Sequence, residues 1–193
     1  MKVVLIDYGA GNTKSVQYAL QRLGVEAVLT NNPELIQKAD KVIFPGVGHA
    51  NSAMEKLEQS GLNKLIPNLK QPFLGICLGM QLMCKYSEEG ATKGLGVFDL
   101  NVLKFGNDNK IPQIGWNTLV DLNSEIFHGL NENEYMYFVH SYYVPIASET
   151  IAKAKYGVIY SAALKKNNFY GCQFHPEKSG DKGELILKNF LAL

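Results

Sequence analysis

A cysteine stands at the centre of a glycine-rich corner of this sequence. Cys77 is the middle residue of "GICLG", which closes the apolar run "PFLGIC". Small residues two positions before and after a nucleophile are typical of a nucleophile elbow, a sharp turn between a strand and a helix. The glycines allow the tight turn, and a helix N-terminus beside the sulfur favours the reactive thiolate. The competing interpretation is a buried cysteine that packs as a small hydrophobe.

A cysteine that attacks an amide needs a base, and the base needs a group that orients it. The chain has four histidines, and His175 is followed directly by Pro176 and Glu177. Because proline stops the strand and restrains the backbone, the carboxylate two residues beyond the histidine can return to the imidazole. A strand-end histidine bonded to nearby backbone is the alternative. Together with Cys77, this spacing favours a catalytic set of Cys77, His175 and Glu177.

Attack on a carboxamide places negative charge on its oxygen, so N–H donors must face that position. The backbone N–H of Leu78, the first residue of the helix expected after Cys77, is one candidate. The second corner, "PGVG" at 45–48, follows the preceding predicted strand at its carboxyl end, where open α/β sheets bind ligands. An ordinary strand-to-helix turn would have the same composition. We expect the region of Val47 and Gly48 to supply the second donor.

Short apolar runs alternate with helical patterns in the first half of the chain. "KVVLID", "EAVLT", "KVIFP" and "PFLGIC" are typical of strands buried on both faces, whereas "TKSVQYALQRLG", "SAMEKLEQSG" and "LGMQLMCKY" are typical of helices. Ser52 and Glu55 fit a capping box. From about Gly94 the segments become strand-like, before a final helix in "KGELILKNFLAL". The sequence predicts one α/β domain over 1–193, with a mixed, mostly parallel central sheet, flanking helices and additional antiparallel strands in the second half.

Composition excludes several functional classes. The formal charge of +1 gives no electrostatic argument for nucleic acid or a membrane surface as partner. The apolar runs are shorter than the roughly 20 residues that span a bilayer, and no leader is visible, so we expect a soluble, cytoplasmic protein. Three cysteines without C-x-x-C spacing argue against disulfides and structural zinc. "YGAGN", followed by Lys14, lacks the third glycine of the dinucleotide fingerprint and the Gly-Lys-Ser/Thr of a phosphate loop, so we assign no nucleotide site to it. We predict no metal and no cofactor.

The segments "PGVG", "GICLGMQL" and "FHPEKS" resemble the class I, or triad, glutamine amidotransferases, which have a flavodoxin-like three-layer fold. The segments "IDYGAGNTKSV", "SEEG", "GLGV", "GWN" and "YFVHSYYV" are similar to the branch that serves imidazole glycerol phosphate synthase. The resemblance implies hydrolysis of L-glutamine to glutamate and ammonia, with Cys77 forming a thioester, His175 transferring protons and Glu177 holding the imidazole. The positions it implies for contacts to glutamine are Gly46, Val47, Gly48, Leu78, Gln81, Ser141 and Tyr142.

The same resemblance implies a protein partner. It would be the synthase (cyclase) subunit HisF, a β/α barrel that forms a heterodimer with the glutaminase and uses the ammonia in histidine biosynthesis. The positions that match the family's docking face are Asn12, Lys14, Trp116, Tyr137 and Lys178. Each has an ordinary alternative, as a core aromatic or a solvated polar side chain. Cys84 and Cys172 lie outside the family pattern, and we expect both to be structural.

Three other functions remain open at this point. A paralogous glutaminase could supply ammonia to a barrel partner that builds modified sugars for surface polysaccharides. A stress-related hydrolase or chaperone could share the cysteine elbow, although that interpretation leaves "HPE" and "GWN" unexplained. A catalytically silent binding subunit is disfavoured because Cys77, His175 and Glu177 are all present.

Overall fold

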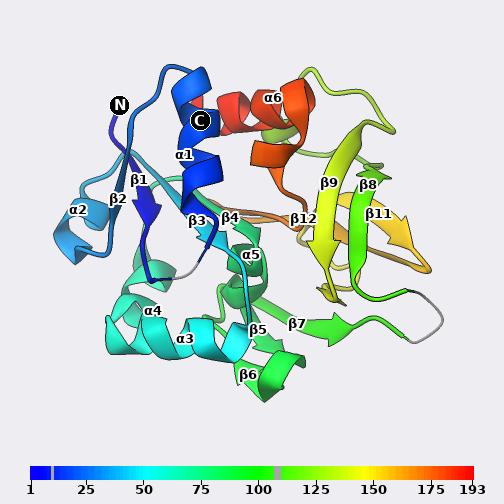
Figure 1. Ribbon diagram of the computed structural model, residues 1–193, viewed down its shortest axis with the longest axis horizontal. Coiled ribbons are helices and arrows are strands. Elements are labelled where there is room, and N and C mark those ends of the chain that lie inside the picture. Colours follow the sequence, from blue (N-terminus) through cyan, green and yellow to red (C-terminus); the bar gives the residue numbers. More distant parts are fainter. Residues whose placement is uncertain (10, 107–109) are drawn as a thin grey trace.

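The computed structural model describes residues 1–9, 11–106 and 110–193. Its main sheet is built from β1 (Val3–Ile6), β2 (Ala27–Thr30), β3 (Lys41–Gly46), β4 (Phe73–Cys77), β11 (Thr150–Tyr156), β12 (Val158–Lys166) and β13 (Phe169–Cys172). The spatial order is β11-β12-β13-β4-β3-β1-β2 (Figure 1). Pairing is parallel from β2 through to β13, and antiparallel from β13 to β12 and from β12 to β11. The prediction of a mixed, mostly parallel sheet is confirmed.

Helices cover both faces of this sheet. They are α1 (Thr13–Arg22), α2 (Pro33–Gln37), α3 (Ala50–Gln59), α4 (Leu62–Leu65), α5 (Leu78–Met83) and α6 (Gly180–Leu191). One apolar cluster joins α1 and α6 to Val3 and Leu5 of β1, and a second joins α3 and α5 to Val4 and Ile6. Because alternate residues of β1 enter different cores, the strand reads as an uninterrupted apolar run. The result is a three-layer α/β fold (Figure 1).

Smaller sheets flank the main one. Their strands are β5 (Cys84–Ser87), β6 (Thr92–Lys93), β7 (Phe98–Lys104), β8 (Gln113–Thr118), β9 (Tyr135–His140) and β10 (Tyr142–Tyr143). Short 3₁₀ turns are η1 (Ile66–Asn68), η2 (Glu89–Ala91), η3 (Glu125–Phe127) and η4 (Pro176–Lys178). The strands β8 and β9 pair as an antiparallel ribbon, and β10-β7-β5-β6 form a sheet of their own. The predicted antiparallel strands of the second half are therefore present.

Two local predictions were wrong. The helix expected over "LGMQLMCKY" ends at Met83, because Cys84 is extended and pairs with Phe98 in β7. Ser52 does not cap α3, which begins two residues earlier with His49 as its N-cap. His49 Nδ1 accepts a hydrogen bond from Asn51 N at 3.3 Å, so the start of the helix is satisfied before Ser52 is reached. Within the described residues, no helix combines the length and apolar character needed to cross a membrane.

Candidate active site

The strand β4 passes into α5 at Cys77 through a strained turn. Cys77 has φ 54° and ψ −111°, a conformation that L-residues rarely adopt and that costs about 1–3 kcal/mol. The flanking glycines permit close packing: a Cβ on Gly75 would lie 2.5 Å from Met83 Cε, and one on Gly79 would lie 2.0 Å from the Phe44 carbonyl oxygen. Glycine is therefore required on both sides of the cysteine for α5 to pack against β3 and β4.

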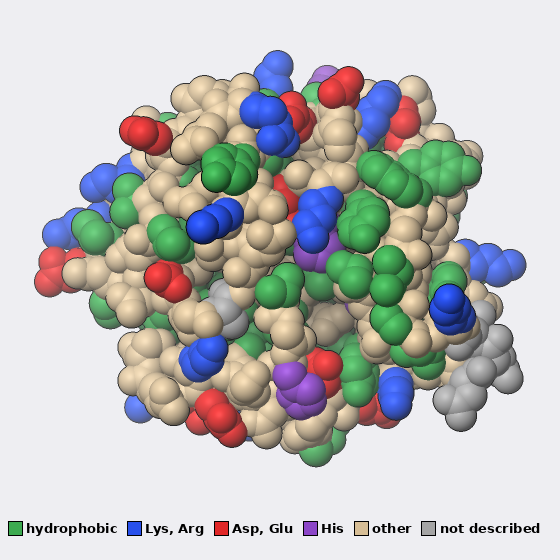
Figure 2. Space-filling model, in the orientation of Figure 1, with side chains coloured by type: hydrophobic (Ala, Val, Ile, Leu, Met, Phe, Trp, Pro, Cys, Tyr) green, Lys and Arg blue, Asp and Glu red, His purple; other side chains and the backbone are tan. Residues whose placement is uncertain are grey.

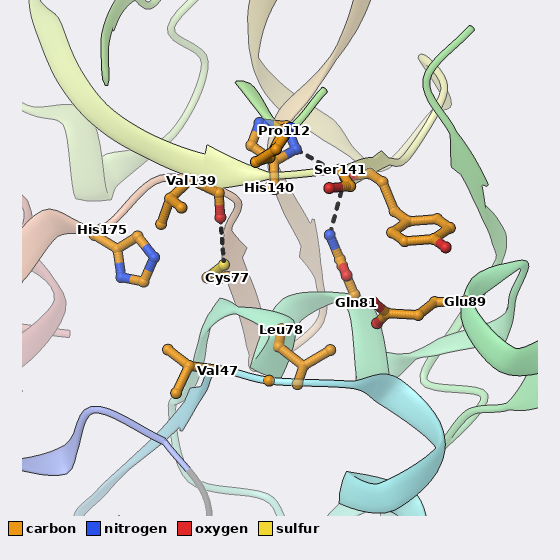
Figure 3. A pocket seen from close by; sticks show the side chains of 12 residues that line it. Val47, Cys77, Leu78, Gln81, Glu89, Pro112, Val139, His140, Ser141 and His175 are labelled. Atoms are coloured by element: carbon orange, nitrogen blue, oxygen red, sulfur yellow. Dashed lines mark hydrogen bonds between the residues drawn. The ribbon is translucent and has the colours of Figure 1, made fainter. Parts of the chain in front are cut away.

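His175 and Glu177 form a buried pair at η4. His175 Nδ1 lies 2.8 Å from Glu177 Oε1, and each side chain is 1% exposed. His175 Nε2 has no hydrogen-bond partner among the described residues, and the ring stands beside the Cys77 sulfur (Figure 3). Burial by itself lowers the pKa of His175, but the interactions with Cys77 and Glu177 outweigh burial and raise this pKa above its ordinary value. The imidazole is therefore placed and tuned to take a proton from the thiol.

One backbone hydrogen bond and two bonds of the Ser179 hydroxyl hold the His175 loop against β9. His175 N donates to the Tyr137 carbonyl at 2.9 Å. The Ser179 hydroxyl donates to the His175 carbonyl at 2.6 Å and accepts from Tyr137 N at 3.0 Å. Ser179 was not among the predicted site residues, although it closes the motif "FHPEKS", which is the signal that could have identified it. Ser179 supports the site by fixing the backbone position of His175, the proposed base.

A pocket of about 380 Å³ opens in front of the cysteine, and Figure 2 shows a hollow near the middle of this face. Its lining consists of Val47, Gly48, Cys77, Leu78, Gln81, Glu89, Pro112, Val139, His140, Ser141, Tyr142 and His175. The volume suits a small polar molecule. Two predicted residues do not line it: Gly46 ends β3 against α5, and Glu177 lies behind His175. The structure thus brings the other predicted substrate positions together.

The oxyanion candidates lie near one another on the side of Cys77 that is opposite Val139 (Figure 3). Leu78 is the first residue of α5, so its backbone N–H is at the start of the helix. Val47 and Gly48 follow β3 directly, and Val47 faces the pocket across from Val139 (Figure 3). Gly48 has φ +101°, a conformation that favours glycine. The arrangement can perform acyl transfer, with a cysteine nucleophile, a histidine base and backbone donors nearby.

Sequence reasoning missed two polar residues of the pocket. Glu89 Oε2 accepts a hydrogen bond from Ala50 N at 2.9 Å and its side chain reaches the pocket wall, where a carboxylate can pair with an ammonium group (Figure 3). The segment "SEEG" contains it but gives no role. His140 Nδ1 donates to the Tyr142 carbonyl at 2.7 Å, and burial lowers the pKa of His140 to about 4. No group of three or more His, Cys, Asp or Glu in the described ranges is arranged to hold a metal ion.

The structure places three of the predicted docking residues together. Trp116 on β8 is 56% exposed, which rules out the core-aromatic alternative for this residue. Its ring meets that of Tyr137 on β9 edge-on at 5.9 Å, and Lys178 Nζ lies 5.8 Å from the Tyr137 ring centroid. Asn12 precedes α1 and Lys14 is exposed in its first turn, while α1 also contacts η4. Apolar side chains gather over β8 and β9, beside the hollow (Figure 2).

Comparison with known proteins defines the class. Residues 4–193 match the family model described as "Glutamine amidotransferase class-I". A putative GMP synthase subunit from Thermoplasma acidophilum superposes with a TM-score of 0.77 at 23% identity, covering 100% of this chain and 92% of that one. PurLQS from Thermotoga maritima superposes with a TM-score of 0.73 at 18% identity, covering 99% of this chain and 97% of that one. These two structures show the shared fold. The chain belongs to the class I glutamine amidotransferases.

Relatives with higher sequence identity show which group of the family the chain belongs to. A protein of Bacteroides fragilis is 56% identical over 100% of both chains, and one of Pectobacterium atrosepticum is 46% identical over 100% of both. Both carry the name imidazole glycerol phosphate synthase subunit HisH. Within the family, the chain belongs to the HisH group, and it is an enzyme of the glutamine amidotransferase class.

Proposed function

We propose that this chain is the glutaminase subunit of imidazole glycerol phosphate synthase. It hydrolyses L-glutamine to glutamate and ammonia and passes the ammonia to the cyclase subunit HisF, its partner in a heterodimer, for histidine biosynthesis. The observation that carries the proposal is the placement of Cys77 and His175 on one pocket, with Glu177 bonded to His175 at 2.8 Å. Identity of 56% to a HisH protein over the whole chain supports the pathway.

The proposed hydrolysis of glutamine proceeds through Cys77 and His175. His175 Nε2 takes the proton from Cys77 Sγ, and the sulfur forms a bond to the carbon of the glutamine side-chain amide. Negative charge develops on the amide oxygen, where Leu78 N–H and the Val47–Gly48 backbone are the proposed donors. The C–N bond breaks as His175 returns the proton to the nitrogen, which leaves as ammonia. Water, activated by the same imidazole, then hydrolyses the thioester and frees Cys77.

The pocket wall provides contacts for the rest of glutamine. The Gln81 side chain and Ser141 stand on one side of Cys77, with the Glu89 carboxylate next to Gln81 (Figure 3). Tyr142 also lines the pocket. Glu89 suits the ammonium group of the substrate, since an opposite charge in a partly enclosed site strengthens the contact. Gly46 contributes by letting α5 approach β3, because a Cβ there would lie 2.5 Å from Gly79 N.

HisF is proposed to dock on an apolar patch beside the pocket. We define this docking patch as Ile114, Trp116, Tyr135 and Tyr137. Ile114 is 64% exposed and Tyr135 is 60% exposed, values unusual for such large apolar side chains. The proposed interface also contains Asn12 and Lys14 at the start of α1 and Lys178 of η4, which contacts α1. Because Tyr137 holds the His175 loop through its backbone, docking can alter the catalytic geometry, and we expect low glutamine turnover in the isolated chain.

The remaining expectations fit this proposal. We treat residues 1–193 as one glutamine amidotransferase domain, in line with a family match over 4–193. A cytoplasmic setting suits the three cysteines, which are all free thiols. The alternative of a paralogue for polysaccharide sugars is less well supported, because the relatives compared above are named for the histidine-pathway synthase.

The test compares two ammonia sources in the complex with HisF. Cys77→Ala is expected to abolish product formation from glutamine and to preserve product formation from added ammonium salt, since only ammonia generation needs the thiol. Loss of both activities would show that Cys77 is structural. A chain that fails to copurify with a barrel synthase and to support its glutamine-dependent reaction would overturn the assignment.

A further inference from the structure

A buried glutamine next to the catalytic cysteine has no role in the steps above. Gln173 follows β13, two residues before His175, and is completely buried. Its Nε2 lies 3.8 Å from Cys77 Sγ, and its Oε1 accepts a hydrogen bond from Gln81 Nε2 at 2.9 Å. A buried primary amide is costly unless its polar atoms are paired, and the polar atoms of Gln173 find their partners in Gln81 and Cys77. Both partners of Gln173 lie on the active-site pocket.

The orientation of the Gln173 amide follows from a backbone carbonyl. Tyr142 O can only accept hydrogen bonds, so His140 Nδ1 at 2.7 Å and Gln81 Nε2 at 3.0 Å must both donate to it. The second N–H of Gln81 then points at Gln173, which must present its oxygen. The Gln173 NH₂ group is consequently directed at the sulfur. The orientation of both side-chain amides, Gln81 and Gln173, is therefore fixed by the Tyr142 carbonyl and is not an arbitrary assignment of oxygen and nitrogen.

The sulfur can donate a hydrogen bond only as a thiol, whereas it can accept one in either protonation state. As a thiol, Cys77 donates to the Val139 carbonyl at 3.7 Å (Figure 3). When the S–H bond breaks and His175 Nε2 takes the proton, the sulfur has nothing left to donate. It can then only accept, and the Gln173 N–H, 3.8 Å from the sulfur, is a neutral side-chain donor aimed at it in addition to the newly protonated His175 Nε2. The bond to Val139 therefore belongs to the thiol alone, whereas the contact to Gln173 is kept and strengthened when the thiolate forms.

We propose that Gln173 is a further functional residue of the glutaminase reaction, with two actions. Its N–H group stabilises the Cys77 thiolate by a hydrogen bond, and its carbonyl holds Gln81 so that Gln81 Oε1 is left for the substrate. Among the described residues, both hydrogen bonds of the Gln81 side chain are made by its nitrogen, which leaves the oxygen available at the pocket. This inference rests on the proposed function, and it adds to it the group that stabilises the attacking atom.

Two substitutions separate the actions. Gln173→Glu keeps an oxygen that accepts from Gln81 but replaces the donor to Cys77 with a negatively charged acceptor. Gln173→Met has similar length and removes both hydrogen bonds. Gln71→Met is the matched control, because Gln71 donates to the Ile36 carbonyl at 2.7 Å and belongs to no part of the active site. Unfolding midpoints in urea establish that each variant is folded.

The decisive readout is the rate at which iodoacetamide alkylates Cys77 in the isolated chain, followed from pH 5 to pH 10 by peptide mass spectrometry. We expect both Gln173 variants to move the midpoint of the rate profile to higher pH and to lower the rate at pH 7 about tenfold. The shift should be larger for Gln173→Glu, and Gln71→Met should match the parent chain. An unchanged midpoint in Gln173→Met, or in both variants, would overturn the proposal. If Gln173→Glu does not fold, Gln173→Met decides alone.

Steady-state kinetics in the HisF complex test the second action. Gln173→Met should raise KM for glutamine and lower kcat, whereas Gln173→Glu should lower kcat with KM near that of the parent chain. Equal effects of both variants on KM would contradict the assigned role in holding Gln81. Alkylation needs neither glutamine nor HisF, so its outcome is independent of the synthase assignment. Shifted alkylation of the isolated chain, combined with no glutamine turnover in the HisF complex of the parent chain, would overturn the proposed function and leave the thiolate contact standing.

Discussion

Gly79 packs so closely on Phe44 that a Cβ at position 79 would lie 2.0 Å from the Phe44 carbonyl oxygen. Backbone atoms cannot move aside as a flexible side chain can, so Gly79→Ala must displace α5 from β3. We expect this variant to lose at least about 3 kcal/mol of unfolding free energy and most of its glutaminase activity. Urea denaturation measures the loss. Gly106→Ala is the control, because no atom of the described residues beyond its chain neighbours lies within 4 Å of its Cβ position, and equal stability of the two variants would contradict the packing argument.

The elbow was predictable because its requirements are local. "GICLG" contains the nucleophile and both small residues, and the short apolar runs before and after it indicate the strands of the sheet. His175 and Glu177 are likewise only two residues apart. These features need no knowledge of distant contacts.

Other features depend on contacts between residues far apart in the chain. Ala50 N is bonded to Glu89, and this pairing across 39 positions helps α3 begin before the capping box that its sequence contains. The role of Gln173 is visible only once Tyr142, Gln81 and Cys77 are placed around it. No local pattern reports which buried polar atoms satisfy one another, so the sequence alone predicts a nucleophile and a base but does not reveal the polar residues that support them.

Glu177→Gln tests the orienting carboxylate. The change preserves size but removes the charge that helps to raise the pKa of His175, so the imidazole becomes a weaker base. We expect kcat for glutamine in the HisF complex to fall about 100-fold or more, with KM little changed. Asp181→Asn provides the control, since Asp181 is an exposed carboxylate in the first turn of α6. Retention of full kcat in Glu177→Gln would remove Glu177 from the catalytic set.

The three cysteines should differ in reactivity. Burial raises the pKa values of the Cys84 and Cys172 thiols above their ordinary range, and both side chains are 0% exposed. Cys77 instead lines the pocket. A glutamine-like chloroketone is therefore expected to label Cys77 about 100-fold faster than the other two, as read by peptide mass spectrometry. Comparable labelling of all three in the folded chain would argue against the elbow as the reactive site.

Trp116→Ala tests the docking patch. Large exposed aromatic side chains often dominate the binding free energy of an interface, so we expect the Kd for HisF to rise about 30-fold. Isothermal titration calorimetry measures the change. Tyr86→Ala removes a partly exposed aromatic from β5, which lies apart from β8 and β9 (Figure 1), and should leave the Kd unchanged. An unaltered Kd in Trp116→Ala would place the partner elsewhere on the molecule.

His140 should make the stability of the fold depend on pH. Burial lowers the pKa of His140 to about 4 in the folded chain, against about 6.5 for an unfolded histidine. Between these values the unfolded chain binds a proton that the folded chain does not, so the free energy of unfolding falls as the pH drops through this window. The expected contribution is on the order of 3 kcal/mol from pH 6.5 down to pH 4.

Acid also protonates carboxylates, so the contribution of His140 must be isolated by difference. His140→Asn places a side-chain N–H where Nδ1 donates to the Tyr142 carbonyl, and it does not titrate in this range. Urea unfolding of both chains at pH 4, 5, 6 and 7 should show that the variant loses less stability on acidification. Parallel curves for the two chains would mean that His140 does not remain neutral in the folded state, because only a proton taken up on unfolding alone produces the extra slope.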